Sequence, residues 1–355
     1  MNNKRLIIPL IVLVLLLALV YVMVQSQQQS KDNKAQFDTI LVGKGSSPKW
    51  SQDGTKIAFI SEDGWLCVTK ANGKGITKSI APIKVLGFDW LSPTEFILWE
   101  QEEQRIEGVL EGPIIRIKKL RLDGLEELII ENSPRKGEVP RITPPVFLPD
   151  GTVGYYENYF KQPPGYVTGE RTFKVIKSGR LKPAQTQKQM RAFVVPSGGT
   201  GAGDIWIESM DGEIKKRITS GRLFSFPELS PDGTKILAVC GSLCGTCIID
   251  LQGNYTCVGK KGYESGDTSS ATLGPPNVKW SPDGKKIAYM YMTGKGEQIE
   301  TIGSDIYIEN LDGTGRIQVT DTPDEYEVYP VWSPDGTKIA CTGYDSHKIY
   351  VIKIK

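Results

Sequence analysis

The stretch WSPDGTKIA, Trp332 to Ala340, recurs almost unchanged as WSPDGKKIA, Trp280 to Ala288. In both copies proline presets φ for the second position of a tight turn, aspartate is tolerated at the third, and glycine takes the position that needs conformational freedom. The residues after the turn alternate, so we expect the lysine outside, the isoleucine inside and the alanine outside. Each copy therefore predicts a tight turn followed by a β-strand. Further copies, two close and two weaker, are WSQDGTKIAFI (50–60), LSPDGTKILAV (229–239), WLSPTEFILWE (90–100) and FLPDGTVGYY (147–156).

A second type of turn follows the copies. Strands such as DIWIESMDG (204–212) and DIYIENLDG (305–313) end in Asp-Gly, one of the strongest short-range signals for a β-hairpin. The repeating unit is therefore strand, S-P-D-G turn, strand, variable loop, strand, D-G turn, strand. Four strands in a repeat of about 40–50 residues form the blade of a β-propeller.

The spacing of the copies predicts the number of blades. Leu148 and Ser230 mark copies that are separated by twice the shortest spacing, so a degenerate blade is expected between them. MRAFVVPS (190–197) and the segment 203–220 supply its strands. We therefore predict an all-β, seven-bladed β-propeller, with six blades as the alternative.

The two ends of the folded region complement each other. The last blade ends at HKIYVIKIK (347–355) and lacks a fourth strand, while FDTILVG (37–43) precedes the first copy. Pairing these segments closes the ring and removes an exposed sheet edge. We expect one propeller domain over residues 37–355, with the strand 37–43 closing the last blade.

The motif carries a family resemblance. W-S-P-D-G-x-K-I-A, preceded by TDTPDEYEVYPV (320–331), resembles the WD40-like repeat of the TolB family. The same repeat is similar to that of the propeller domains of prolyl-oligopeptidase-type peptidases. No stretch fits the additional α/β domain of TolB, and the chain ends where those peptidases carry an α/β-hydrolase domain. The resemblance, which covers about residues 37–355, implies a propeller fold and a binding role.

The N-terminus is strongly apolar. Leu6 to Val24 contains no charged residue, and a helix of this length spans about the 30 Å hydrocarbon core of a bilayer. Lys4 and Arg5 precede it, so the positive-inside rule leaves residues 1–5 in the cytoplasm. Residues 6–24 are therefore predicted to be a transmembrane signal anchor, followed by a polar linker over 25–36. The protein is expected in the cell membrane as a single-pass protein with its propeller outside the cytoplasm, or secreted if the chain is cleaved after Ser26.

Six cysteines fit an oxidising, extracytoplasmic compartment. We favour disulfides over an iron–sulfur or zinc site, because an exported β-hairpin is an unsuitable scaffold for the former. Cys247 is expected almost opposite Cys257 in one hairpin and opposite Cys240 in the previous one, so the pairing stays open. A bridge between Cys67 in the first blade and Cys341 in the last, which become neighbours when the ring closes, is a further option. The disulfide candidates are Cys67, Cys240, Cys244, Cys247, Cys257 and Cys341.

Charge and motifs give no sign of catalysis. The net charge is +2, from 43 basic and 41 acidic residues, which provides no basic surface for nucleic acid. His347 is the only histidine and lies far from any nucleophile-elbow pattern. The acidic residues Asp321, Asp324, Glu325 and Glu327 lack the spacing of a calcium loop and are expected in a solvated turn. We predict no catalytic residue, no metal and no cofactor, although two carboxylates in a funnel would leave no linear signature.

The variable loops between second and third strands lie on one face of a propeller and are the expected binding face. Five aromatic residues lie in or beside them: Trp99, Tyr159, Tyr166, Tyr291 and Tyr344. We interpret the protein as a monomeric, noncatalytic platform for an envelope or cell-surface protein. The alternatives are a propeller lyase or hydrolase that acts on extracellular polysaccharide, and a purely structural surface component.

Overall fold

The computed structural model contains only strands as regular elements in the residues that it describes. These are residues 37–75, 78–82, 85–106, 109–132, 138–142, 146–147, 153–161, 166–177, 190–196, 202–209, 214–221, 224–240, 246–258, 278–294, 302–322 and 325–354. Within these ranges, no helix is long and apolar enough to cross a membrane. The predicted span over residues 6–24 lies outside them.

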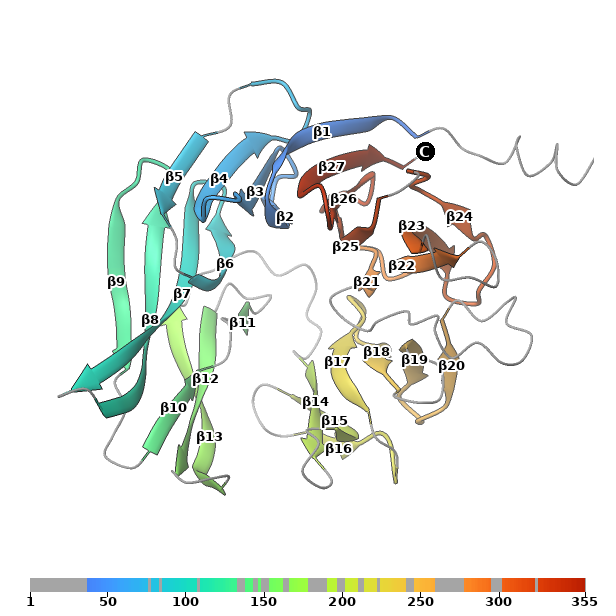
Figure 1. Ribbon diagram of the computed structural model, residues 1–355. Helices are drawn as coiled ribbons and strands as arrows, with labels where there is room; N and C mark the ends of the chain where they lie inside the picture. Colours follow the sequence, from blue (N-terminus) through green and yellow to red (C-terminus); the bar gives the residue numbers. More distant parts are fainter. Residues whose placement is uncertain are drawn as a thin grey trace, which may run out of the picture.

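The strands form seven antiparallel sheets arranged in a ring (Figure 1). The first sheet contains β2 (Ser46–Trp50), β3 (Lys56–Ile60), β4 (Trp65–Lys70) and β5 (Lys78–Pro82). The second contains β6 (Val85–Ser92), β7 (Glu95–Ile106), β8 (Val109–Arg121) and β9 (Glu126–Asn132). The third contains β10 (Glu138–Ile142), β11 (Val146–Phe147), β12 (Val153–Lys161) and β13 (Tyr166–Lys177). The fourth sheet contains β14 (Met190–Pro196), β15 (Gly203–Ser209) and β16 (Lys215–Arg217), and the fifth contains β17 (Ser225–Leu229), β18 (Lys235–Val239), β19 (Thr246–Asp250) and β20 (Tyr255–Cys257). The sixth contains β21 (Val278–Trp280), β22 (Lys286–Gly294), β23 (Ile302–Asn310) and β24 (Ile317–Gln318). The last contains β25 (Glu327–Trp332), β26 (Lys338–Gly343), β27 (Lys348–Lys353) and β1 (Thr39–Lys44).

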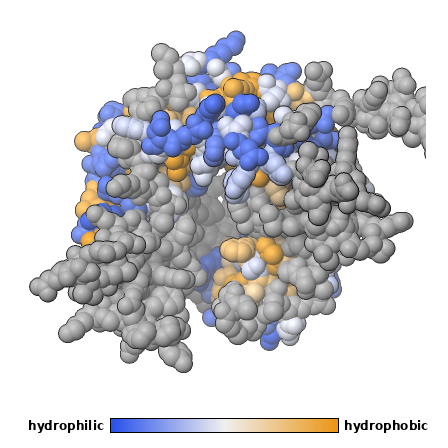
Figure 2. All heavy atoms as spheres, in the orientation of Figure 1, coloured by the Kyte–Doolittle hydropathy of each residue, from blue (hydrophilic) through white to orange (hydrophobic). Residues whose placement is uncertain are grey.

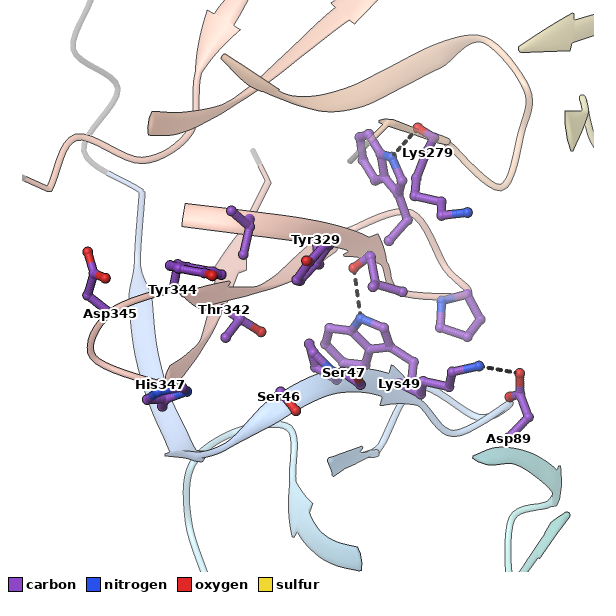
Figure 3. A pocket seen from close by; sticks show the side chains of 16 residues that line it. Ser46, Ser47, Lys49, Asp89, Lys279, Tyr329, Thr342, Tyr344, Asp345 and His347 are labelled. Atoms are coloured by element: carbon purple, nitrogen blue, oxygen red, sulfur yellow. Dashed lines mark hydrogen bonds and ion pairs between the residues drawn. The ribbon is translucent and has the colours of Figure 1, made fainter. Parts of the chain in front are cut away.

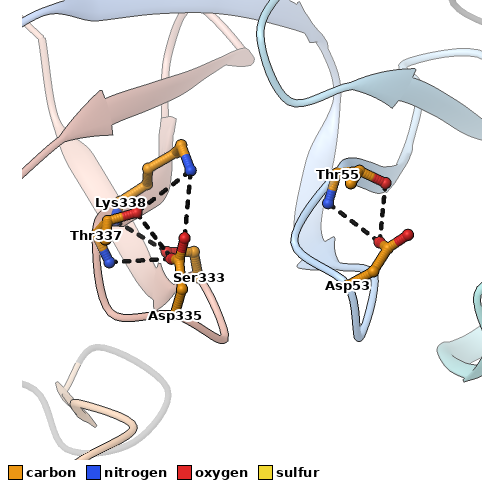
Figure 4. A network of polar contacts seen from close by, with 6 residues as sticks. All are labelled: Asp53, Thr55, Ser333, Asp335, Thr337 and Lys338. Carbon is orange, nitrogen blue, oxygen red and sulfur yellow. Dashed lines mark hydrogen bonds and ion pairs between the residues drawn. The ribbon is translucent and has the colours of Figure 1, made fainter.

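The S-P-D-G motif forms the turn between the first and second strands of a sheet, as its sequence predicts. At the last copy, Ser333 Oγ donates to Asp335 Oδ1 at 2.6 Å, and the same oxygen accepts the backbone N–H of Thr337 at 3.0 Å (Figure 4). The backbone N–H of Lys338 donates to Ser333 Oγ at 2.9 Å, which closes the turn. Gly336 has a φ of 69°, a conformation that favours glycine. The Ser–Asp contact of 2.6 Å recurs at the motifs that begin at Ser51, Ser230 and Ser281.

The tryptophan before the turn joins neighbouring sheets. Trp332 Nε1 donates to the carbonyl oxygen of Lys279 at 3.3 Å, and Trp50 Nε1 donates to that of Val331 at 2.9 Å. In both cases the acceptor is the residue directly before the tryptophan of the preceding copy. Trp280 and Trp90 make the equivalent bonds to the carbonyl oxygens of Glu228 and Lys49. The repeated tryptophan therefore fixes the spacing between the innermost strands.

The second strand of each motif is buried on both faces, which corrects one expectation from the sequence. Ile57 and Phe59 pack against the sheet that contains β26 and β27, whereas Ala58 packs against the sheet that contains β6 and β7. The alanine was expected outside, yet Ala58 is completely buried. Because each sheet is covered by a neighbour on either side, a small residue faces one neighbour and a large residue faces the other.

The ends of the described chain meet in one sheet. β1 pairs antiparallel with β27, from Thr39 opposite Ile352 to Lys44 opposite Lys348. β1 is thereby the outermost strand of a sheet whose innermost strand is β25. This is the pairing that the sequence predicts. The expected strands of the degenerate repeat are also present, as the three-stranded sheet of β14, β15 and β16.

Candidate functional site

The innermost strands β2, β17 and β25 share one irregularity. Their ladders are interrupted between Ser46 and Lys49, between Ser225 and Glu228, and between Val328 and Val331. Each interruption holds a residue of positive φ followed by proline, which has no N–H to give to the ladder. These dipeptides are Ser47-Pro48, Phe226-Pro227 and Tyr329-Pro330, with φ of 57°, 50° and 57° at the first residue.

This backbone conformation is costly. A residue other than glycine in the left-handed region costs about 1–3 kcal/mol and persists where surrounding structure enforces it, which is often at a functional site. Within the described ranges, His347 (φ 52°) is the one further residue of this kind. Ser47, Tyr329 and His347 all line a single pocket. The strain of the described chain is therefore concentrated there.

The pocket lies along the inner strands β2 and β25 and has a volume of about 990 Å³. Figure 3 shows Tyr344, Thr342 and Tyr329 on the β25–β26 side and Ser46 and Ser47 on the β2 side. Trp50 and Trp332 form its apolar wall. An apolar pocket with a few polar groups is the usual form of a ligand site.

Two lining residues are suited to binding. Tyr344 is 60% exposed, and an exposed tyrosine offers a large contact area with a polar tip. Thr342 is 3% exposed, and its Oγ1 has no hydrogen-bond partner among the residues that the structure describes. A buried hydroxyl without a partner costs free energy.

The charged residues of the pocket are mostly paired. Lys49 Nζ lies 2.6 Å from Asp89 Oδ2, and Lys279 Nζ lies 2.6 Å from Glu228 Oε2. These pairs join β2 to β6 and β21 to β17, and their partly exposed side chains contribute only up to about 1 kcal/mol each. Asp345 also lines the pocket and forms no ion pair within the described ranges.

Acidic residues are buried behind the pocket wall. Glu327 on β25 is completely buried, and neither carboxylate oxygen has a hydrogen-bond partner in the described part of the chain. Burial raises its pKa to about 8. Burial, followed by the charge of Asp321, raises the pKa of Asp305 on β23 to about 6. Glu325 is also buried, so Glu325 and Glu327 do not lie in the solvated turn expected from the sequence, whereas Asp321 is exposed as expected. Asp324 lies outside the described residues.

The structure separates the five aromatic candidates. Tyr344 lines the pocket, whereas Trp99 packs over Gly87 within its own sheet: a Cβ built on Gly87 would lie 2.3 Å from the indole. Tyr291 stacks on the guanidinium of Arg316, 4.3 Å from its ring centre, and contacts Tyr307. Tyr159 and Tyr166 lie on β12 and β13, opposite Thr168 and Lys161, and their side chains are outside the description.

Several predicted loops are strand extensions. Two of the variable loops expected between second and third strands are the segments 100–112 and 158–171. In the structure, β7 and β8 pair as far as Ile106 and Val109, and β12 and β13 pair as far as Lys161 and Tyr166. The charged sequence of the first segment hid this pairing, since an arm beyond the core needs no apolar face.

The cysteines differ from the predicted pairings. Cys67, Cys240, Cys247 and Cys341 are buried thiols, so the suggested bridges of Cys247 with Cys240 or Cys257, and of Cys67 with Cys341, are not formed. Cys67 packs against the last sheet, but Cys341 points to the opposite side of that sheet, toward β22 and β23. Cys247 lies opposite Cys257, as expected. On the other side, its partner in the ladder is Ala238 and not Cys240. Cys257 is disulfide-bonded, and Cys244 lies outside the described residues.

Within the described ranges, no group of three or more histidine, cysteine, aspartate or glutamate side chains is placed to hold a metal ion. Ser47, Tyr329 and the position of His347 in the pocket were not predicted from the sequence. The repeated X-Pro dipeptide, two positions before the tryptophan or leucine of the motif, is the signal that would have found the first two.

The chain was compared with known proteins. No family model matches it. Among curated proteins, it is 41% identical over 69 residues to dipeptidyl-peptidase 5 of Porphyromonas gingivalis. That match covers 19% of this chain and 10% of the length of the peptidase.

Solved structures share the fold. A chain of the mitotic checkpoint complex matches with a TM-score of 0.50 and 12% identity, over 91% of this chain and 95% of the other. The β-propeller domain of Cps50 (Swd1) from Myceliophteria thermophila matches with a TM-score of 0.48 and 12% identity, over 90% of this chain and 100% of the other. An oligogalacturonate lyase from Vibrio parahaemolyticus matches with a TM-score of 0.38 and 13% identity, over 88% of this chain and 78% of the other. Together with the repeated four-stranded sheets, the first of these confirms the β-propeller fold.

Proposed function

We propose that the protein is a membrane-anchored, extracytoplasmic, seven-bladed propeller that binds a protein of the cell envelope or surface through the pocket between β2 and β25. One observation carries this proposal. Three of the four strained non-glycine residues in the described chain line that pocket. Backbone strain of this kind clusters at functional sites, and ligand binding is the simplest function for a pocket.

The chemistry of the pocket supports a binding role. The exposed ring of Tyr344 stands at its rim and the hydrogen-bonding capacity of Thr342 Oγ1 is unused within the described ranges. Figure 2 shows a patch of apolar residues on the lower part of the molecule, and Phe226 on β17 is 67% exposed. Exposed aromatic residues around a recess are typical anchors for a protein partner.

The architecture and location are supported by separate observations. Seven sheets in the described residues, one of them closed by β1, favour seven blades over six. The uncharged segment from Leu6 to Val24, preceded by Lys4 and Arg5, favours an anchor with the propeller outside the cytoplasm.

The polysaccharide lyase or hydrolase has weaker support. Its carboxylates would have to face the pocket, but Asp89 is tied to Lys49 and Glu327 does not line the pocket. His347 and Asp345 remain as polar groups at the rim. Turnover of an extracellular glycan that is lost in His347→Ala would favour the enzyme.

Affinity capture tests the binding role. The full-length chain, purified in mild detergent and immobilised, is exposed to solubilised envelope from the native host. We expect one protein to be retained by the wild type and by Lys285→Ala, which alters an exposed residue in an S-P-D-G turn. Tyr344→Ala should weaken binding of that purified protein about tenfold or more. Equal retention by both variants, or no specific retention, contradicts the proposal.

A further inference from the structure

The wall of the pocket has an acidic reverse side. On β26, Thr342 lines the pocket, while its neighbour Cys341 belongs to the apolar cluster shared with β22 and β23. Gly343 is opposite Glu327 in the ladder, and a Cβ built on it would lie 2.6 Å from Glu325 Oε1. Successive residues of a strand point to opposite sides. The same short segment therefore faces the pocket with one set of side chains and buried carboxylates with the other.

Glu327 is enclosed by acidic or neutral groups. The titratable groups that act on it or share its surroundings are Asp305 on β23, Asp321 and Glu325 before β25, Cys341 on β26 and Tyr350 on β27. No ion pair with Glu327 is formed within the described ranges, and neither of its oxygens has a partner within hydrogen-bond distance there. The side chain of Thr322 acts to lower the pKa of Glu327, but burial outweighs it. An ionised carboxylate in such a place is strongly unfavourable, so the packed state needs the neutral acid.

The position of Glu327 links it to the binding residues. It is two residues before the strained Tyr329 on β25, and its main-chain oxygen accepts the hydroxyl of Ser304 on β23 at 3.0 Å. The bridge between Ser304 and Tyr326 holds the same end of β25 against β23. If Glu327 ionises, water must enter or this end must separate from β23, and either change moves Tyr329.

We propose that the β25–β26 wall is a proton-sensitive element, which keeps the shape of the pocket only while Glu327 holds its proton, so that partner binding weakens as the proton is lost. The part about binding rests on the proposed function. The packed state binds a proton that an opened state releases, so the free energy of opening falls as pH rises toward the pKa of the packed state and levels off above it. The pKa of about 8 for Glu327 sets that upper limit.

Hydrogen exchange of the full-length chain tests the strand change without a partner. Asp305 has a pKa of about 6, so its contribution to the pH dependence lies mainly below pH 6. The change between pH 6 and 8 therefore reports on Glu327. After correction for intrinsic exchange, we expect protection of β25 and β26 to fall about 100-fold across this interval. It should stay constant in Glu327→Gln, which mimics the protonated acid. Glu309→Gln is the matched control, since Glu309 is buried on β23 but accepts a hydrogen bond from Tyr289 at 2.8 Å.

Retention of the envelope protein at pH 6 and pH 8 tests the link to binding. Retention should be lower at pH 8 for the wild type and Glu309→Gln, and equal at both values for Glu327→Gln. The proposal is overturned if wild-type protection shows no step, if Glu327→Gln keeps the step, or if protection falls while retention does not. A step in protection with no protein retained at either pH supports the strand change and instead contradicts the proposed function.

Discussion

Two carboxylates of the last sheet, Asp335 and Glu327, have opposite surroundings. Asp335 accepts hydrogen bonds from Ser333 and from the backbone of Thr337, and these bonds, the serine first, hold its pKa at about 2. Glu327, at the other end of β25, has no hydrogen-bond partner in the described residues, and burial raises its pKa to about 8. The turn end of the sheet satisfies its polar groups, and the pocket end leaves them unsatisfied.

The same contrast holds in the backbone. At the turn end, positive φ falls on the motif glycines, such as Gly54 and Gly336. At the pocket it falls on Ser47, Tyr329 and His347. The comparison teaches that the repeated motif serves stability, whereas the residues that vary between repeats at the inner strands are free to serve binding.

The largest expected effect is at the turn end. Trp332→Ala removes a buried indole and its bond to the carbonyl oxygen of Lys279, and it should lower the free energy of unfolding by about 3–5 kcal/mol. Trp332→Phe keeps most of the buried volume but loses the hydrogen bond. Its free energy of unfolding should therefore fall by about 1 kcal/mol for the lost bond, in addition to the cost of its smaller loss of volume. Urea unfolding measures both. If the alanine variant is as stable as the wild type, the tryptophan does not join the sheets.

The next effect is at the pocket end. The native state holds the proton of Glu327 and the unfolded chain releases it, so the contribution is full below about pH 4.5 and is lost as pH rises through about 8. Between pH 6 and 8 the free energy of unfolding should fall by about 2–3 kcal/mol in the wild type. The Glu327→Gln variant should lose this dependence. A wild-type profile that is flat over the same interval would remove the contrast between the two ends.

A smaller effect is expected in the turn itself. Ser333→Ala removes the hydroxyl that donates to Asp335 and accepts the N–H of Lys338, at a cost of about 1 kcal/mol at neutral pH. The depressed pKa of Asp335 gives the wild type stability that is present above about 3.8 and lost as pH falls through about 2. As pH falls, the variant should therefore lose stability at a higher pH than the wild type, closer to the ordinary pKa of an aspartate. Identical acid profiles would show that the serine does not stabilise the carboxylate.

The smallest effect would sharpen the comparison. Ser47→Gly places glycine where φ is 57° and removes only an exposed hydroxymethyl group. Relief of strain competes with the greater freedom of glycine in the unfolded chain, so stability should be unchanged or rise by up to about 1 kcal/mol. Thermal unfolding measures this. A loss of more than 1 kcal/mol would mean that Ser47 is held for stability.

The fold could be predicted to a large extent because its signals are local. S-P-D-G and D-G turns determine where hairpins form, and the unpaired third strand at the C-terminus required a partner such as 37–43. The burial of Ala58 was missed because alternation describes one buried face, and here both faces are covered.

The site could be predicted only in part. Tyr344 was identified because aromatic residues in a turn are conspicuous, and Trp99 and Tyr291 were identified for the same reason although they pack internally. The burial of Glu327 depends on the docking of β25 against β23, a contact between distant segments that no local pattern encodes. The linear sequence shows four acids and cannot show which of them the neighbouring sheet covers.

Photo-crosslinking in the native host tests the central claim, that the pocket is the working end of the molecule. A benzophenone amino acid is placed at Tyr344, on the rim of the pocket, or at Lys285, on an S-P-D-G turn, in otherwise identical full-length chains. The account predicts a discrete protein adduct from position 344 and none of comparable yield from position 285. An adduct from position 285 alone, or equal adducts from both positions, would contradict it.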